Sequence, residues 1–451
     1  MAGTIPHSPV NGSREQGMDP VVITALDQEG RGITRVDGKA VFVEGALIGE
    51  RVSIEVFHKK PNYEQARAVE IHTRSSMRAI PRCPHFGVCG GCSLQHAEAS
   101  AQVASKQRVL EDALWHIGRV RPHQMLAPIH GPTWAYRQRA RLSVRDVPKK
   151  GGVLVGFRER KSSYVTDMTS CEVLPGRISA LLPELRALVG RLSIHDRLPQ
   201  IELACGESAT GPVDALVLRI LAPQSVDDER ELVAFADRHR VHIWLQSGGP
   251  ATVRPFYPAE CNLVYALPDF GVSFAFDPTD FTQVNADVNR VLVRRAMGLL
   301  APTHSERIAD FFCGLGNFTL PIARHGASVI GIEGSATLIR RAEANAAANG
   351  LATNATFATA NLFEATPESV AALGFLDKAL IDPPREGAIA LVKSLPAQGL
   401  ARIVYVSCNP ATLARDAAVL VNEHGYALRA AGIANMFPHT AHVESIALFE
   451  R

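Results

Sequence analysis

The sequence predicts an α/β fold in three parts: an N-terminal OB-like β-barrel, a central α+β domain and a C-terminal Rossmann-like domain. Two observations predict it. Short β-rich runs separated by turn residues fill Val21 to about Thr73, which is typical of a small barrel. From about residue 276, apolar strands, Gly-containing loops and helices alternate, which favours a doubly wound parallel sheet.

The 451 residues leave room for several domains. We expect a disordered tail over residues 1–20, the barrel over 21–75, the central domain over 76–275 and the Rossmann-like domain over 276–451. The tail lacks the apolar core of a signal peptide, and no apolar run is long enough to span a membrane. We therefore expect a cytoplasmic protein whose eight cysteines are not disulfides.

Basic residues are concentrated in one stretch, although the net charge of the chain is only +2. Between Trp134 and Lys161, nine Lys and Arg residues stand against Asp146 and Glu159. Such a stretch suits the phosphate backbone of a nucleic acid. A solvated protein surface produces the same pattern, so charge alone leaves both readings open.

The first strand of the Rossmann-like region ends in a turn, Gly314-Leu315-Gly316, and a predicted helix follows. Small residues there let the backbone approach a ligand closely. Glu333, at the end of the next predicted strand, can bind a ribose diol. An NAD site more often has a third glycine, so the pattern favours S-adenosylmethionine over NAD. A strand-to-helix turn without any ligand is the alternative.

A rigid loop, Asp382-Pro383-Pro384-Arg385, follows another predicted strand. Proline after Asp382 forces an extended backbone. Similar loops hold an exocyclic amine in amino-methyltransferases. The loop therefore supports methyl transfer without selecting an acceptor, and an amino group is one alternative.

Cys408 lies at the exposed end of the next predicted strand, and it favours carbon 5 of uracil over an amino group as the methyl acceptor. Carbon 5 of uracil is a poor nucleophile, but a thiolate that adds to carbon 6 makes it nucleophilic. Such a cysteine is expected to have a lowered pKa, and a base must then remove the carbon 5 proton. We expect Cys408 to be the nucleophile and Glu444 the base. A buried, unreactive cysteine is the alternative.

Three cysteines, Cys83, Cys89 and Cys92, lie within ten residues, which marks a metal site in a reduced protein. Cys171 is the expected fourth ligand. Four thiolates suit zinc or an iron–sulfur cluster, and their spacing does not decide between them. Cys205 and Cys261 are expected to be buried, and Cys313 to fill space beside the cofactor, although it is the rival nucleophile.

Together the segments FCGLGNF, DPPR, SCNP and FPHTAHVE resemble the RNA uracil-C5 methyltransferase family, over nearly the whole chain from about Val21. The barrel and the cysteines are most similar to its rRNA branch, which has a TRAM barrel and a [4Fe-4S] cluster and modifies a 23S rRNA uridine of the 1939 type. The resemblance implies that the four cysteines hold this cluster, and it supports the roles of Cys408 and Glu444. It also implies an S-adenosylmethionine site lined by Gln283, Phe312, Asn317, Glu333, Asn361 and Asp382.

The expected partner is 23S rRNA, with no membrane and no obligate protein partner. One alternative is methylation of carbon 5 of a different rRNA or tRNA uridine. Another is a non-catalytic RNA-binding protein with a zinc site, whose Rossmann-like domain has lost its ligand. The intact Gly-x-Gly turn, Glu333, Cys408 and Glu444 speak against the latter.

Overall fold

The computed structural model describes residues 19–208, 211–396 and 398–451, and the chain forms two compact units, Met1–Arg78 and Ala79–Arg451. Of the tail expected over residues 1–20, residues 1–18 lie outside the described part of the chain. The other expected domain limits stay predictions. In the described part of the chain, no helix combines the length and the apolar character needed to cross a bilayer.

The first unit is built on a six-stranded sheet with the order β1-β5-β6-β4-β3-β2. Its strands are β1 (Val21–Val22), β2 (Ala25–Leu26), β3 (Gly32–Val36), β4 (Lys39–Glu44), β5 (Arg51–Lys59) and β6 (Tyr63–Thr73). The outer strands β1 and β2 are consecutive pieces of one segment, which pairs with β5 and with β3. The sheet therefore closes into a barrel around a small apolar core, and the predicted OB-like barrel is confirmed.

The second unit begins with a mixed sheet in which β10 is central, pairing with β11, with β8 and, at its far end, with β14. Its strands are β8 (Arg139–Val147), β9 (Gly152–Gly156), β10 (Gln200–Ser208), β11 (Gly211–Arg219), β12 (Val241–Gln246), β13 (Val253–Tyr257), β14 (Leu263–Leu267) and β15 (Val272–Phe276). Strands β11 and β12 are parallel because a helix connects them. The helices packed here are α2 (Gly176–Ser179), α3 (Leu181–Arg191) and α4 (Val226–His239).

The C-terminal sheet has the order β18-β17-β16-β19-β20-β22-β21-β7. Its strands are β7 (Gln124–Met125), β16 (Arg307–Phe311), β17 (Ser328–Glu333), β18 (Ala355–Thr359), β19 (Lys378–Ile381), β20 (Arg402–Ser407), β21 (Ala427–Ala434) and β22 (Glu444–Glu450). The five strands from β18 to β20 in this order are parallel, as doubly wound α/β folds require.

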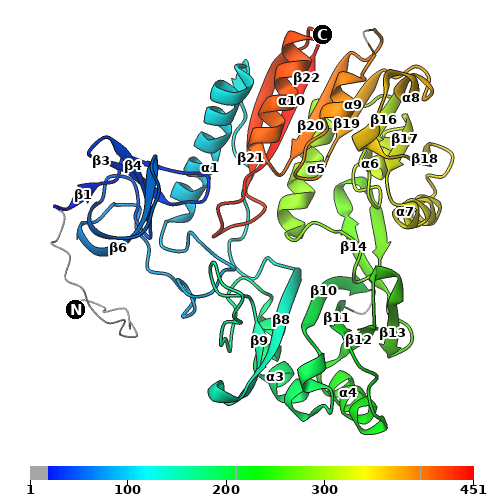
Figure 1. The fold of residues 1–451 in the computed structure, drawn as a ribbon. Coiled ribbons are helices and arrows are strands. Elements are labelled where there is room, and N and C mark those ends of the chain that lie inside the picture. The colour runs from blue at the N-terminus through cyan, green and yellow to red at the C-terminus, as the bar shows by residue number, and fades with distance from the viewer. Residues whose placement is uncertain (1–18, 209–210, 397) are drawn as a thin grey trace. The chain divides into compact units, whose positions relative to one another are not determined.

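Helices cover both faces of this sheet, so it is buried between two apolar layers (Figure 1). The helices are α1 (Ala99–Ala113), α5 (Ala286–Leu300), α6 (Thr319–Arg324), α7 (Ala336–Ala348), α8 (Pro367–Ala371), α9 (Ile389–Lys393) and α10 (Pro410–Asn422). One layer contains side chains of α1, α8, α9 and α10, and the other contains those of α5, α6 and α7. The predicted α/β class is confirmed.

One strand departs from the predicted parallel sheet. β22 runs antiparallel to both β20 and β21. Only residues 435–443 connect β21 to β22, and a loop of this length cannot carry the crossover that a parallel pair needs. At the far edge, β7 pairs with β21, so residues that precede the second sheet in the sequence complete the third.

Candidate functional site

A cavity of about 520 Å³ lies at the carboxyl ends of the parallel strands β16, β17, β19 and β20. Ligands of open α/β sheets bind at this edge. The cavity is lined by all eight residues predicted for the cofactor site and for catalysis: Gln283, Phe312, Asn317, Glu333, Asn361, Asp382, Cys408 and Glu444. The structure brings these residues together, while their individual roles stay predictions.

The Gly-x-Gly turn after β16 adopts backbone conformations that few residues tolerate. Gly314 and Gly316 have φ of +55° and +92°, and Phe312, which is not a glycine, has φ of +65°. Left-handed backbone at such a residue is costly and is concentrated at ligand sites. The Glu333 carboxylate accepts hydrogen bonds from the N–H of Gly314 at 3.3 Å and of Ser335 at 3.1 Å. These bonds fix an acid beside the turn, where it faces the cavity.

Two further cavity residues are amides held by local partners. The Asn317 side-chain oxygen accepts from the Asn289 amide at 3.0 Å and from the Tyr265 hydroxyl at 3.3 Å. The Asn361 side chain accepts from the N–H of Phe363 at 3.1 Å. Asn289 and Tyr265 were not predicted from the sequence, because nothing in the local pattern of α5 or β14 marks them as neighbours of the Gly-x-Gly turn.

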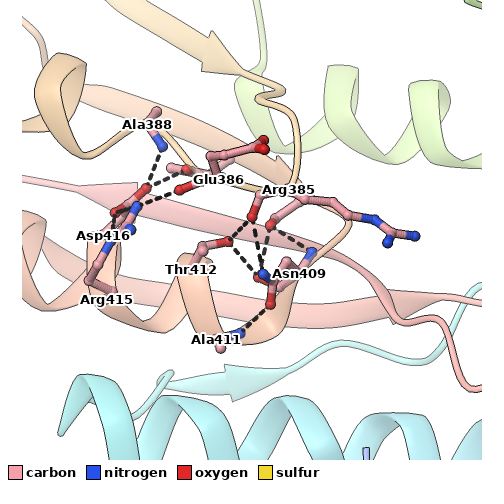
Figure 2. A network of polar contacts seen from close by, with 10 residues as sticks. Arg385, Glu386, Ala388, Asn409, Ala411, Thr412, Arg415 and Asp416 are labelled. Carbon is pink, nitrogen blue, oxygen red and sulfur yellow. Dashed lines mark hydrogen bonds and ion pairs between the residues drawn. The ribbon is translucent and has the colours of Figure 1, made fainter. Parts of the chain in front are cut away.

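The loop that follows β19 is pinned to the start of α10 by polar contacts (Figure 2). The Arg385 carbonyl accepts a hydrogen bond from the Asn409 amide at 3.1 Å. Further along, the N–H of Ala388 donates to the buried Asp416 carboxylate at 2.7 Å. Since Asn409 adjoins Cys408 in the sequence, the network fixes the Asp-Pro-Pro loop relative to the cysteine.

Cys408 directly follows β20 and is half-buried, so its sulfur reaches the cavity. The prediction that the pKa of Cys408 is lowered is wrong. Burial, followed by Glu444 and Asp382, raises the pKa of the Cys408 thiol to about 11, and Arg385 opposes the shift. Two nearby carboxyl groups outweigh one guanidinium, so an additional positive charge is needed before the thiolate forms readily.

Glu444 is the first residue of β22 and lies opposite Ala434 of β21. It is 4% exposed. Burial and the neighbouring Asp382 raise the pKa of Glu444 well above its usual value, and Arg385 opposes the shift. Burial also raises the pKa of Asp382 to about 7. A raised pKa at both carboxyl groups is a property of groups that exchange protons during catalysis.

Two cavity residues, Arg385 and His442, were quoted within motifs but given no role by the sequence. A guanidinium nitrogen of Arg385 lies 3.2 Å from His442 Nδ1. Among the described residues that line the cavity, Arg385 is the one lysine or arginine. Burial, followed by Arg385, lowers the pKa of His442 to about 4, so the ring is neutral at pH 7. Their positions inside DPPR and FPHTAHVE were the available signal.

The four cysteines predicted to bind metal line a second, small cavity of about 20 Å³ with apolar neighbours that include Phe86, Phe157 and Met168: Cys83, Cys89, Cys92 and Cys171. Burial raises the pKa of the Cys92 thiol to about 12 and that of Cys171 to about 11. Within the residues that the structure describes, no group of three or more His, Cys, Asp or Glu side chains is arranged to hold a single metal ion. Four converging thiols fit the donor set of an iron–sulfur cluster, in which each sulfur binds a different iron atom.

The other cysteines occupy different surroundings. Cys205 is buried, as predicted, whereas Cys261 is only half-buried. Cys313 is 5% exposed, and its sulfur packs closely against Gly331 of β17. Burial, then Asp310, raises the pKa of the Cys313 thiol well above its usual value. Close packing makes Cys313 a poorer candidate nucleophile than Cys408.

Comparisons with known proteins place the chain in a family. Residues 130–451 match the tRNA (uracil-5-)-methyltransferase family, and residues 20–69 match the TRAM domain. The 23S rRNA (uracil(1939)-C(5))-methyltransferase RlmD of Aromatoleum aromaticum is 63% identical over 96% of this chain and 100% of its own. The enzymes of the same name from Azoarcus sp. and Cupriavidus metallidurans are 62% and 59% identical, each over 96% of this chain and over 100% and 95% of their own.

Among solved structures, the tRNA (uracil-54, C5)-methyltransferase of Pyrococcus abyssi in complex with S-adenosyl-L-homocysteine has the same fold. It aligns with a TM-score of 0.73 over 96% of this chain and 100% of its own, at 23% identity.

Proposed function

The chain belongs to the tRNA (uracil-5-)-methyltransferase family, and we propose that it methylates carbon 5 of the uridine at the 1939 position of 23S rRNA with S-adenosylmethionine as donor. One observation carries the proposal. Cys408 and Glu444, the nucleophile and base that this chemistry needs, line the same cavity as the Gly-x-Gly turn. The high identity to curated enzymes with this target supports the choice of nucleotide.

The donor site consists of the cavity residues around the Gly-x-Gly turn. Glu333 binds the ribose diol, and the aromatic ring of Phe312 and the amides of Gln283, Asn317 and Asn361 complete the pocket. The lining has three acids, Glu333, Asp382 and Glu444, against Arg385. This acidic balance favours a cationic ligand such as a sulfonium. The charge of the sulfonium also supplies the missing stabilisation for a Cys408 thiolate.

The target uridine is flipped out of its stack so that Cys408 reaches carbon 6. The thiolate forms a bond to carbon 6, and the electrons of the carbon 5–carbon 6 double bond move to the carbonyl oxygen at carbon 4 as an enolate. The enolate then attacks the methyl carbon through carbon 5, and the electrons of the broken carbon–sulfur bond leave with S-adenosylhomocysteine.

Release of the product needs a base. The Glu444 carboxylate takes the proton from carbon 5, the electrons of that bond restore the double bond, and the Cys408 thiolate departs. Burial suits this role because it raises the proton affinity of Glu444. Asp382, held after β19, lies close enough to raise the pKa of both groups. Asp382 takes the proton that the Cys408 thiol loses, which leaves the Glu444 carboxylate free for the carbon 5 proton.

A [4Fe-4S] cluster held by Cys83, Cys89, Cys92 and Cys171 is the second part of the proposal. The convergence of the four thiols on one apolar cavity supports it. When bound, the cluster would be held by the thiolates of these four cysteines and would tie residue 171 to the segment 83–92. Nothing in the methyl transfer itself requires electron transfer, so the cluster stabilises the structure around it.

Removal of one ligand tests the cluster. The purified protein is expected to be brown and to contain about four iron atoms per chain. Cys92→Ser is expected to lose the colour and most of the iron, whereas Cys261→Ser, outside the cavity, keeps both. Iron and sulfide analysis with visible absorption checks this. A colourless wild-type protein that holds zinc contradicts the cluster and favours the zinc-site alternative.

Exposed basic side chains in both units fit an RNA partner, 23S rRNA on this proposal. They are Arg51, Lys59, Lys60, Arg67 and Arg74 in the barrel, and Arg141, Arg145, Lys149, Lys150, Arg158 and Lys161 in the second unit. Not all of the basic stretch faces solvent, because Arg139 donates to the carbonyl of Pro278 at 2.6 Å. The exposed members are suited to phosphates, which contribute affinity without base specificity.

Mapping of modified nucleotides tests the target. In cells that lack this chain, 5-methyluridine is expected to disappear from one position of 23S rRNA, equivalent to 1939, and to return with the wild-type gene but not with Cys408→Ala. Loss of the modification from tRNA, or from another rRNA position, contradicts the assigned nucleotide but keeps the chemistry. Loss of a methylated amino group contradicts the chemistry as well.

A further inference from the structure

The loop between β21 and β22, residues 435–443, contains a strained residue that the proposed chemistry does not use. His439 has φ of +64° and is 4% exposed. A residue with a side chain adopts this left-handed conformation at a cost, and it persists only where surrounding contacts determine it. The contacts that hold His439 are therefore informative about what the loop does.

The backbone of His439 is fixed from two sides. Its carbonyl accepts hydrogen bonds from the N–H groups of Ser93 and Leu94, each at 2.9 Å, directly after the last cysteine of the segment 83–92. Its own N–H donates to the side-chain oxygen of Gln102, on α1, at 2.7 Å. The same Gln102 amide donates to the carbonyls of Leu94 at 3.1 Å and Ala97 at 2.8 Å, so one buried side chain joins the residues just after the cysteine segment to the loop.

The ring of His439 is held as well. It stacks on Trp134 with ring centroids 3.8 Å apart, and its Nδ1 accepts from the Gln102 amide at 3.2 Å. Two more buried groups secure the loop on either side. Lys106 of α1 donates to the Asn435 side chain at 2.7 Å, and the Tyr136 hydroxyl donates to the carbonyl of Pro438 at 2.9 Å. Ser93, Leu94, Gln102 and Trp134, which hold His439, all lie outside the sheet that carries the loop.

This loop forms one wall of the catalytic cavity. Phe437, His442 and Val443 line the cavity beside Glu444. The pairing of Glu444 with Ala434 fixes the backbone of Glu444 in the sheet, and its side chain lines the cavity beside these loop residues. A displaced loop would admit water to the carboxyl group and change its geometry toward carbon 5.

We propose that Gln102 and His439 are positioning residues, which hold the loop 435–443 closed over Glu444 and connect its position to the segment that contains Cys83, Cys89 and Cys92. The proposal rests on the proposed function of Glu444 as the base. It predicts that the release step depends on residues far from the reacting atoms, whereas attack by Cys408, which directly follows the neighbouring strand β20, depends on them less.

Gln102→Leu tests the proposal. Gln107→Leu is the matched control on the same helix, where the Gln107 amide donates to the Glu111 carboxylate at 3.1 Å. With ordinary RNA and donor, Gln102→Leu is expected to slow release by about 10- to 100-fold, so that a denaturation-resistant enzyme–RNA adduct accumulates. Capture of 5-fluorouridine RNA, which needs no release, is expected to stay within about 3-fold of wild type, as does the control in both assays.

The pH dependence of release separates positioning from general loss of structure. Water that reaches Glu444 lowers its raised pKa, so the acid side of the release profile is expected to shift to lower pH in Gln102→Leu. The other titratable or charged groups near Glu444 are Asp382, Arg385, Cys408 and His442, and none of them is altered by the change. An unshifted profile with normal release contradicts the proposal.

Hydrogen exchange provides a readout that does not depend on activity. Removal of iron from the wild-type protein is expected to raise amide exchange in residues 435–443 together with residues 93 and 94. Gln102→Leu is expected to raise exchange in 435–443 and also at residues 93 and 94, because their N–H groups donate to the His439 carbonyl. Unchanged exchange in 435–443 in both cases overturns the inference. If the wild-type protein forms no adduct at all, the proposed function fails instead, and the exchange experiment still decides whether the loop is held.

Discussion

Replacing Cys408 by alanine is expected to abolish both methylation and covalent capture of RNA that contains 5-fluorouridine. Without the thiolate, carbon 5 of uracil stays a weak nucleophile. The covalent intermediate cannot form, and no other group of the enzyme replaces it. Loss of a nucleophile of this kind lowers turnover by at least about 10⁴-fold. Single-turnover transfer of a labelled methyl group, with a denaturing gel for the adduct, measures both effects.

Cys313→Ser is the matched comparison for this variant. Cys313 lines the same cavity but packs against Gly331, and its pKa is raised well above the usual value, first by burial. Covalent capture of 5-fluorouridine RNA is expected to survive this change, even if the altered cavity lowers the rate. An alanine variant at position 408 that remains active would end the covalent mechanism, and capture lost only in the Cys313 variant would move the nucleophile to that residue.

Glu444→Gln is expected to separate formation of the adduct from its release. The amide cannot accept the carbon 5 proton, so the methylated adduct forms but decays slowly, by about 10²- to 10⁴-fold. Rapid-quench time courses on unmodified RNA would reveal a covalent complex that persists after the methyl group has been transferred. Normal decay of the adduct would remove Glu444 from its role.

The wild-type release rate is also expected to depend on pH in one direction. Only the carboxylate form of Glu444 accepts a proton, and burial followed by Asp382 raises its pKa. Release should therefore slow as the pH falls through that raised pKa, which lies well above the usual range of a glutamate. In Glu444→Gln this dependence should be absent, because glutamine does not titrate.

The sequence was sufficient for the elements whose signal is local. The Gly-x-Gly turn, the Asp-Pro-Pro loop and Cys408 each follow an apolar strand, and the carboxyl ends of neighbouring parallel strands meet at one edge of a sheet. Glu444 was found through its motif, and it reaches the same cavity because β22 pairs with β20 in a register that sets Ser445 opposite Ser407.

Properties that depend on the whole fold were not predictable in this way. The direction of β22 follows from a short connection whose ends the sequence did not mark. The shift in the pKa of Cys408 was predicted with the wrong sign. The causes of the shift are burial and the carboxyl groups of Asp382 and Glu444, which the fold brings to Cys408 from distant parts of the sequence. Gln102 and Lys106 contact a loop more than 300 residues away, and a helix pattern gives no sign of such partners.

The most direct test of the account is to locate the covalent bond. The protein is incubated with 5-fluorouridine RNA and S-adenosylmethionine, digested, and the peptide that carries the nucleotide is sequenced by mass spectrometry. The bond is expected on Cys408, with fluorine and the transferred methyl group both retained at carbon 5. A nucleotide attached to Cys313, or complete methylation of uridine RNA with no trapped fluorinated adduct, would contradict the account.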